Sequence, residues 1–393
     1  MKKCVISNLG TIVTGKTPST KNENYWGNEI PFVTPKDIQS SKHIFNTERY
    51  LTTNGANSVK GCILPPKSIC VSCIGNIGYT SMTIDRAVSN QQINSIIVNN
   101  EHDIDFVYYL MKSLWSYFKN YEGQSTTVSI LNKSQFSKIE ILIPDNINIE
   151  RKIAAILSSL DNKIELNQRV NNNLEQQAQA LFKSWFVDFE PFGGKMPDDW
   201  KVGIADDIIT LFDSQRIPLS SNQRENMEKI YPYYGATSLM DYVDQYIFDG
   251  KYLLLGEDGS VVDDYGFPIL QYVWGKFWVN NHAHILQGKN GFTVESLYLF
   301  FKCTNVKSIV TGAVQPKINQ ANLKSIPAIV PTINVMNNFN NVINPLFSLF
   351  RKNIEENTRL AQLRDTLLPK LMSGEIDVSK VNISADKLSF TEE

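Results

Sequence analysis

The 393-residue sequence lacks the features of a membrane, secreted or strongly basic protein. It has no run approaching the roughly 18 consecutive apolar residues of a membrane-spanning helix. Its five cysteines, an odd number behind an N-terminus too polar for a signal peptide, favour the reducing cytoplasm over a disulfide framework. The net charge of −2 excludes DNA binding by bulk positive charge, so DNA contact would need local patches or a partner that supplies charge.

Motifs for methyl-transfer or nucleotide chemistry are also missing or incomplete. The chain has no Asn-Pro-Pro-Tyr/Phe and no Gly-x-Gly-x-x-Gly motif. Gly10–Thr17 matches the phosphate-binding loop pattern, so a nucleotide-binding enzyme built on this loop is the alternative function. However, Pro18 and polar residues follow it where that loop needs a helix, and its β-branched interior favours a strand. Lys16 is better interpreted as a contact to DNA phosphate.

Two small groups of potential metal ligands do not predict a metal site. Cys70 and Cys73 form a single Cys-x-x-Cys without a second ligand pair, which favours cysteines buried in a strand. His282 and His284 lie on one face of an expected strand, and two ligands do not make a site. We expect these histidines to contact DNA or to pack on the strand face.

The sequence contains two similar halves. Phe136–Pro144 and Leu323–Pro331 both alternate in the manner of a strand and end at a proline. Upstream, Val88–Ile93 resembles Val279–His284. The spacing between these marks is about ten residues longer in the second half, as expected for a surface-loop insertion.

A long helical pattern follows each half, with apolar residues and two asparagines at alternating steps of three and four. The first seam consists of Leu157, Leu160, Ile164, Asn167, Asn171, Leu174, Ala178, Leu181 and Trp185. The second consists of Ile343, Leu346, Phe350, Asn353, Asn357, Leu360, Arg364, Leu367 and Leu371. Such seams predict an antiparallel coiled-coil pair in which the asparagines face one another and fix the register. The alternative is that each helix packs only on its own domain.

These patterns predict an α+β fold made of two strand-rich modules and two long helices, with short helices such as Asp105–Tyr117. The expected segments are a first module (1–149), a central helix (150–190), a second module (191–338), a distal helix (339–377) and a flexible tail (378–393). The central seam alone would span roughly 42 Å at 1.5 Å per residue. The helix pair would therefore act as a rigid spacer between the modules.

Several segments resemble the specificity subunit of type I restriction-modification systems. Ile6–Gly10, Gly15–Pro18, Tyr25–Gly27 and Ile30–Ile38 resemble the opening of a target recognition domain. The ends of the two long helical regions in that family are similar to Leu181–Phe189 and Leu367–Ile376. The resemblance covers nearly the whole chain, although Ile204–Pro218 lacks the Gly-Lys-Thr-Pro run that opens the first module.

This resemblance implies a non-catalytic DNA-recognition subunit in the cytoplasm. In that family each recognition domain reads one half of a split, asymmetric DNA target. The paired helices set the unread spacer and dock two methyltransferase subunits, and restriction subunits join this core. The resemblance also implies that S-adenosylmethionine, ATP and Mg²⁺ belong to the partner chains and that this chain binds no cofactor.

Candidate DNA contacts are polar residues in loops next to strands, because amide and basic side chains pair with base edges and phosphates. They are Lys16, Lys36, Asn76, Arg86, Asn90, Gln91 and Gln92 in the first half, and Lys251, Asn281, His282, His284, Gln315 and Lys317 in the second. Residues 1–149 carry 14 basic and 11 acidic residues, whereas residues 191–335 carry 12 and 15. We therefore expect the second module to bind DNA weakly alone and the methyltransferase to supply much of the positive channel.

Overall fold

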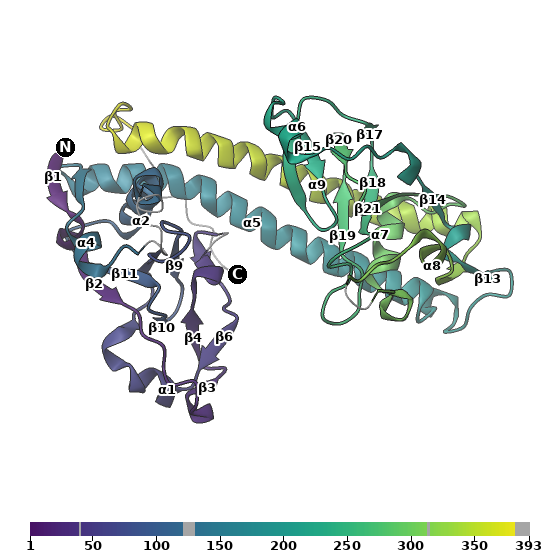
Figure 1. The fold of residues 1–393 in the computed structure, drawn as a ribbon, viewed down its shortest axis with the longest axis horizontal. Helices are drawn as coiled ribbons and strands as arrows, with labels where there is room; N and C mark the ends of the chain where they lie inside the picture. The colour runs from purple at the N-terminus through teal and green to yellow at the C-terminus, as the bar shows by residue number, and fades with distance from the viewer. Residues whose placement is uncertain (39–40, 121–129, 313–314, 382–393) are drawn as a thin grey trace. The chain divides into compact units, whose positions relative to one another are not determined.

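The computed structural model describes residues 1–38, 41–120, 130–312 and 315–381, and the chain divides into two compact units. Unit 1 comprises Met1–Gln168 with Ile354–Glu393, and unit 2 comprises Arg169–Asn353. Figure 1 shows the elements of both units. Among the described helices, none combines the length and apolar character that crossing a membrane requires.

Unit 1 contains two five-stranded sheets and a two-stranded one. The first sheet consists of β2 (Gly10–Thr14), β5 (His43–Ile44), β8 (Ile69–Ser72), β9 (Thr80–Thr83) and β11 (Ile93–Val98), in the order β2-β11-β8-β9-β5. The second consists of β3 (Trp26–Gly27), β4 (Ile30–Val33), β6 (Arg49–Leu51), β7 (Ile63–Leu64) and β10 (Ala87–Ser89), in the order β3-β6-β4-β10-β7. The small sheet pairs β1 (Lys2–Val5) with β12 (Glu140–Ile143). The short helices are α1 (Thr53–Ser58), α2 (Ile104–Ser113), α3 (Trp115–Lys119) and α4 (Lys133–Ser137).

Unit 2 has two four-stranded sheets and a two-stranded one. The first sheet consists of β14 (Ile209–Leu211), β18 (Tyr252–Gly256), β19 (Leu270–Val273) and β21 (Ala283–Gly288), in the order β14-β21-β18-β19. The second consists of β15 (Tyr231–Tyr234), β16 (Leu239–Val243), β17 (Phe248–Asp249) and β20 (Lys276–Val279), in the order β16-β15-β20-β17. The small sheet pairs β13 (Lys201–Ile204) with β22 (Pro327–Val330). The short helices are α6 (Ser221–Glu225), α7 (Val294–Lys302) and α8 (Gln320–Lys324).

The two units share one strand topology. The order β2-β11-β8-β9 of unit 1 corresponds to β14-β21-β18-β19 of unit 2, and β6-β4-β10-β7 corresponds to β16-β15-β20-β17. The directions also agree, because β10 is parallel to β4 and antiparallel to β7, as β20 is to β15 and β17. The predicted α+β fold with an internal repeat is therefore confirmed.

Two 40-residue helices follow the repeats, α5 (Ile147–Phe186) and α9 (Ile333–Met372). Each unit holds one half of each helix, and the halves pair antiparallel (Figure 1). In unit 1 the Asn167 amide donates to Asn357 Oδ1 at 2.9 Å. In unit 2 the Asn353 amide donates to Asn171 Oδ1 at 2.8 Å. The predicted pairing of asparagines across an antiparallel seam is thus present in the structure.

The seam residues lie in the interior of the two units. Leu157, Leu371 and Ile343 are buried, and the other apolar seam positions are buried or half-buried. Leu157, Leu368 and Leu371 join the main core of unit 1, whereas Ala178, Phe182 and Ile343 join that of unit 2. Each half of the helix pair is therefore part of the core of its own unit.

Several local expectations need adjustment. The distal helix begins at Ile333 rather than at 339. Its first turns carry a buried stripe of Met336, Phe339 and Ile343, which was hard to recognise in the sequence because asparagines lie between these residues. Val378 is buried in the core of unit 1, so the tail predicted from 378 is wrong at this residue; residues 382–393 lie outside the described ranges. The phosphate-loop alternative is wrong, because Gly10–Thr14 forms strand β2 and no helix follows it directly. Cys70 and Cys73 are buried in and beside β8, as expected.

Candidate nucleic-acid interface

The first sheet of unit 1 brings several predicted DNA contacts to one end. β11 runs antiparallel to β2 and β8, with Asn94 opposite Thr14 and Ile93 opposite Ser72. The segments after β2 and β8 and before β11 therefore meet, and we call residues 15–18, 73–79 and 90–92 the loop end of unit 1. These segments contain Lys16, Asn76, Gln91 and Gln92.

Short contacts hold these segments together and leave polar groups outside. The Lys16 backbone N–H donates to Ser89 O at 2.9 Å, and the Thr17 hydroxyl donates to Gln91 Oε1 at 2.7 Å. Only glycine fits at position 15, because a Cβ there would lie 2.2 Å from Ser89 O. The side chains of Lys16, Asn76 and Gln91 are exposed, and Lys16 has no ion pair among the described residues. A free cation and exposed amides at one sheet end suit phosphate and base contacts.

The other candidates of unit 1 are placed differently. Asn90 is 8% exposed and exchanges hydrogen bonds with Gln92, so its side chain closes the turn before β11 rather than projecting outward. Lys36 is exposed in the loop after β4, whose end lies beside Ser89, and pairs loosely with Glu48 at 3.5 Å. Arg86 is exposed but precedes β10, at the opposite end of that strand from Asn90.

Unit 2 has an equivalent loop end. It consists of residues 212–216, 257–269, 280–282 and 315–317, where β14 and β18 end and β21 begins. The exposed residues there are Asn281, His282, Gln315 and Lys317. The backbone of Lys317 forms an isolated β-bridge with Asp258, in the loop between β18 and β19. The structure also adds Arg216, whose guanidinium reaches Ala283 O at 2.7 Å. The sequence missed Arg216 because no motif or strand pattern marks its segment.

Two candidates of unit 2 must be corrected. Lys251 lies at the start of β18, the opposite end from the loops, and its ammonium group pairs with the buried Glu295 at 2.6 Å. His284 is completely buried on β21, so its side chain contacts the protein interior rather than DNA. The prediction of DNA contact is therefore wrong for His284, and Lys251 serves to neutralise a carboxylate.

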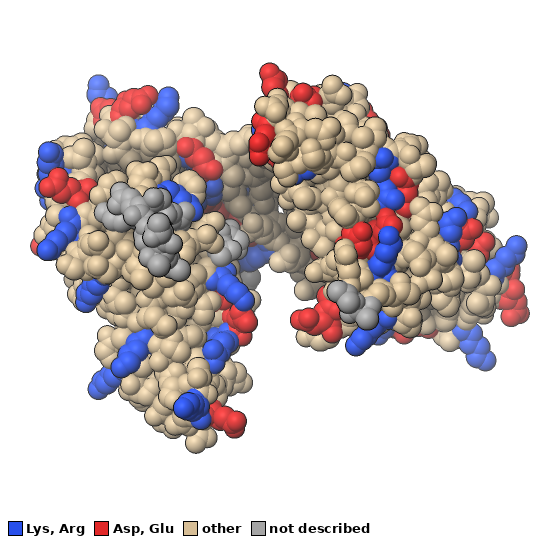
Figure 2. All heavy atoms as spheres, in the orientation of Figure 1, with Lys and Arg blue, Asp and Glu red and all other residues tan. Residues whose placement is uncertain are grey.

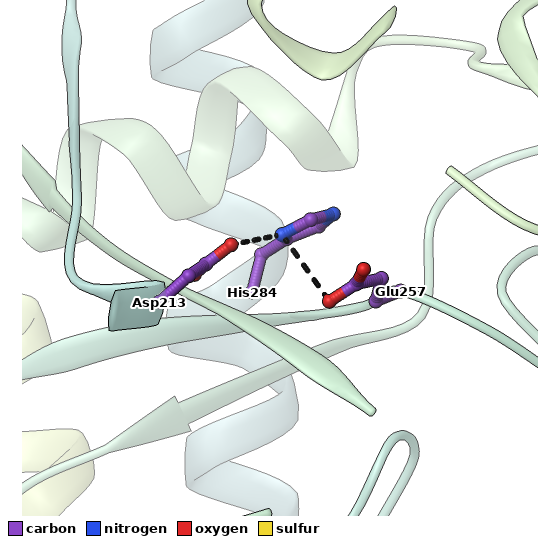
Figure 3. A group of neighbouring side chains, drawn as sticks. All are labelled: Asp213, Glu257 and His284. Atoms are coloured by element: carbon purple, nitrogen blue, oxygen red, sulfur yellow. Dashed lines mark hydrogen bonds and ion pairs between the residues drawn. The ribbon is translucent and has the colours of Figure 1, made fainter. Parts of the chain in front are cut away.

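His284 is the centre of a buried polar network (Figure 3). Its Nδ1 lies 2.6 Å from Asp213 Oδ2 and 3.8 Å from Glu257 Oε2, while Nε2 lies 2.7 Å from Ile318 O. The Ile318 carbonyl can only accept, so Nε2–H donates to it, while Nδ1 faces the Asp213 carboxyl group. The ring is thus held between a carboxyl group and a backbone carbonyl. The hydrogen bond between His284 and Ile318 O holds the segment between Lys317 and α8 in place.

The same network contains further cations. Arg216 pairs with Glu257 at 2.6 Å and Lys317 pairs with the same carboxylate at 3.2 Å. Burial raises the pKa of Asp213, but the His284 hydrogen bond and charge outweigh it, so the pKa lies below the ordinary aspartate value. Burial also raises the pKa of Glu257. The hydrogen bond from Arg216 and the electrostatic effects of His284 and Arg216 outweigh burial, so the pKa of Glu257 is lowered as well. Asp213, Glu257 and His284 lie close enough to hold a cation, but Arg216 and Lys317 already pair with the Glu257 carboxylate.

Unit 1 has a neutral version of this network. By strand register Thr14, Cys73 and Asn94 correspond to Asp213, Glu257 and His284. Thr14 donates to Asn94 Oδ1 at 2.6 Å, and the Asn94 amide donates to Cys73 Sγ and Leu131 O at 3.1 Å each. Leu131 and Ile318 occupy equivalent places, because the Leu131 N–H donates to Cys73 O after β8 and the Ile318 N–H donates to Glu257 O after β18. The two loop ends therefore share one architecture with neutral chemistry in unit 1 and ionised chemistry in unit 2.

The charges available to a ligand differ accordingly. Lys16 of unit 1 is free of carboxylates among the described residues, whereas Arg216, Lys317 and His282 of unit 2 each contact an acidic group. On the visible face of unit 2, acidic and basic side chains lie next to one another (Figure 2).

Comparison with known proteins identifies the family. The sequence matches the type I restriction modification DNA specificity domain twice, over residues 1–176 and 197–364. The chain belongs to this family. It acts in sequence-specific DNA recognition, and no comparison supports the nucleotide-binding alternative.

Individual relatives agree with this assignment. The MjaIX specificity subunit of Methanocaldococcus jannaschii is 27% identical over 96% of this chain and 93% of its own length. The HindI specificity subunit of Haemophilus influenzae is 40% identical over 42% of this chain and 37% of its own. The crystal structure of the S subunit from M. genitalium has the same fold, with a TM-score of 0.56 at 18% identity, covering 94% of this chain and 96% of that one.

Proposed function

We propose that each unit of this specificity subunit reads one half of a split, asymmetric DNA target with its loop end. The single observation that carries the proposal is the repetition of one sheet-end geometry with different side chains. In the equivalent turns before β11 and β21, unit 1 holds Gln91 and Gln92, whereas unit 2 holds Asn281 and His282. Unlike readers on a common scaffold suit unlike half-sites.

We further propose that the long helices set the spacer and dock two methyltransferase subunits, which restriction subunits join. Two exposed apolar residues of α9, Val342 and Leu349, are seven residues apart and so share one helix face beside the seam. An exposed apolar pair of this kind suits contact with a partner helix. S-adenosylmethionine, ATP and Mg²⁺ would be held by those partners, in the cytoplasm where the DNA is.

The test is to exchange one module and map DNA methylation. Residues 1–146 would be replaced by the corresponding segment of another specificity subunit, and genomic methylated adenines compared between hosts carrying either version. We expect one half of the methylated sequence to change while the other half and the spacer stay the same. An unchanged methylated sequence would refute the assignment of unit 1 to a half-site.

Lys16 provides a finer prediction. Replacing Lys16 with alanine should weaken binding to specific and random duplexes by a similar factor, because a phosphate contact carries no sequence information. The slope of log K against log salt concentration should fall in magnitude by about 1. Lys138→Ala is the matched control, because it removes an exposed positive charge at the other end of β2 from Lys16. The neighbouring Ile139 accepts a backbone hydrogen bond from Ile6, which precedes the start of β2. Equal salt slopes for the two variants would exclude Lys16 as a phosphate contact.

A further inference from the structure

The loop between β18 and β19 has a counterpart in unit 1. It corresponds by topology to the β8–β9 loop, which presents Asn76, but runs over residues 257–269 rather than 73–79. The longer loop accounts for part of the extra spacing in the second half of the sequence. The tip of the longer loop carries the aromatic residue Tyr265.

Tyr265 is more exposed than any other large apolar or aromatic residue in the described ranges, at 80%. An exposed ring contributes little to the stability of its own chain, because burial is what stabilises apolar surface. By contrast, the neighbouring Phe267 is half-buried and Val261 is fully buried in the core. The tip of this loop is therefore apolar surface that the chain itself leaves uncovered.

The backbone beneath this ring is held in place. Asp263 Oδ1 accepts hydrogen bonds from the N–H groups of Tyr265 and Phe267 at 2.9 Å each. The Asn305 amide donates to Tyr265 O at 2.7 Å. Gly266 takes φ +89°, a conformation that L side chains rarely adopt, and its Cβ position is filled by Asn305 and Lys307. A ring presented on a fixed backbone loses little conformational entropy on binding.

The loop is also tied to the loop end of unit 2. Within the loop, Val262 and Pro268 form an isolated β-bridge. Asp258 forms another with Lys317, and the Gly259 N–H donates to Pro316 O at 3.0 Å. The cations of this loop end are engaged with Glu257. Contact with bases through an uncharged aromatic face would not depend on those cations.

We infer that Tyr265 contacts base surfaces in the half-site read by unit 2, through the face of its ring. The inference rests on the function proposed above and names a specificity-determining residue within it. Aromatic and apolar side chains contact DNA by inserting between base steps or packing on thymine methyl groups. Both modes depend on the ring and not on the hydroxyl group.

The test uses the complete complex with its methyltransferase subunits and a duplex that carries the mapped methylation target. Tyr265→Ala should weaken binding about tenfold, in the range of one lost aromatic–base contact. Tyr265→Phe should bind within about twofold of wild type, since it keeps the ring. Discrimination against a scrambled second half-site should fall, whereas discrimination against a scrambled first half-site should not change.

The control is Tyr242→Ala, which removes an exposed tyrosine on β16 at the end of that strand away from the loop end. It should bind like wild type, and both alanine variants should melt at the wild-type temperature. Wild-type affinity for Tyr265→Ala, equal loss in Tyr265→Phe, or equal loss of discrimination at both half-sites would overturn the inference. If the wild-type complex itself failed to discriminate the half-sites, the proposed function would fail instead.

Discussion

Replacing His284 with leucine should destabilise unit 2 by about 3–5 kcal/mol, the cost of removing one partner of a buried carboxylate. The substitution leaves Asp213, which is 6% exposed, without the ring nitrogen that lies 2.6 Å from its carboxylate. It also removes the donor to Ile318 O. The effect is measured by urea unfolding, with hydrogen exchange of the β21 amides reporting the stability of unit 2, which contains the change.

The matched control is His282→Leu, two residues away. His282 pairs with Asp258 but its side chain is 47% exposed, so the loss should stay below about 1 kcal/mol. The double variant Asp213→Thr/His284→Asn transplants part of the neutral unit 1 set and should recover part of the loss. A His284→Leu protein as stable as wild type would show that the pair contributes nothing.

The ion pair also predicts the acid response of unit 2. Because the folded-state pKa of Asp213 lies below its ordinary value of 3.8, its contribution is fully present above that pH. The contribution is lost as pH falls through the lower, folded-state pKa. The stability difference between wild type and Asp213→Thr should therefore shrink only at strongly acidic pH.

The second large effect is expected at Asp161 of α5 in unit 1. Its carboxylate is 4% exposed and accepts from Arg364 Nη1 of α9 at 2.6 Å and from the Tyr109 hydroxyl of α2 at 2.7 Å. Burial and then the Asp161 charge raise the pKa of Tyr109, so the hydroxyl keeps its proton and donates. Asp161→Leu should cost about 3–5 kcal/mol, since it leaves Arg364 without its buried partner.

A double-mutant cycle measures this pair. Asp161→Leu/Arg364→Met should lose less than the sum of the two single variants, because the second change removes a guanidinium that the first leaves with only the exposed Asp365 as a partner. Lys163→Met is the control, as it breaks an exposed pair with Glu356 at 3.4 Å and should cost less than about 1 kcal/mol. Additive losses in urea unfolding would indicate that Asp161 and Arg364 act independently.

The fold could be predicted because its largest features repeat in the sequence. The asparagines at 167, 171, 353 and 357 mark the seam, since amides at the core positions of a heptad pattern are typical of helix pairs with a fixed register. The alternation within Phe136–Pro144 correctly predicted a strand, which is β12 (Glu140–Ile143). The start of α9 was harder to predict, because asparagine is also a turn former.

The binding-site residues were harder because strand register is invisible in one sequence. The sequence similarity of the two halves aligns Val88 with Val279 and therefore makes Ile93 the counterpart of His284. The hydrogen bonds instead match Asn90 with Asn280, since each N–H donates to the end of the parallel strand, at Val33 O and Tyr234 O. A shift of one residue moves every side chain to the other face of a strand. His284 therefore corresponds to the buried Asn94 and not to Ile93.

The division of the chain has a consequence for its synthesis. Unit 2 is one uninterrupted segment, Arg169–Asn353, whereas unit 1 needs Ile354–Glu393 to complete it. Leu368, Leu371 and Met372 belong to the core that Ile153 and Leu157 begin. As the ribosome delivers the chain from its N-terminus, unit 2 has all its residues while the earlier unit still lacks one side of its core. The first part to be translated is therefore the last that can close.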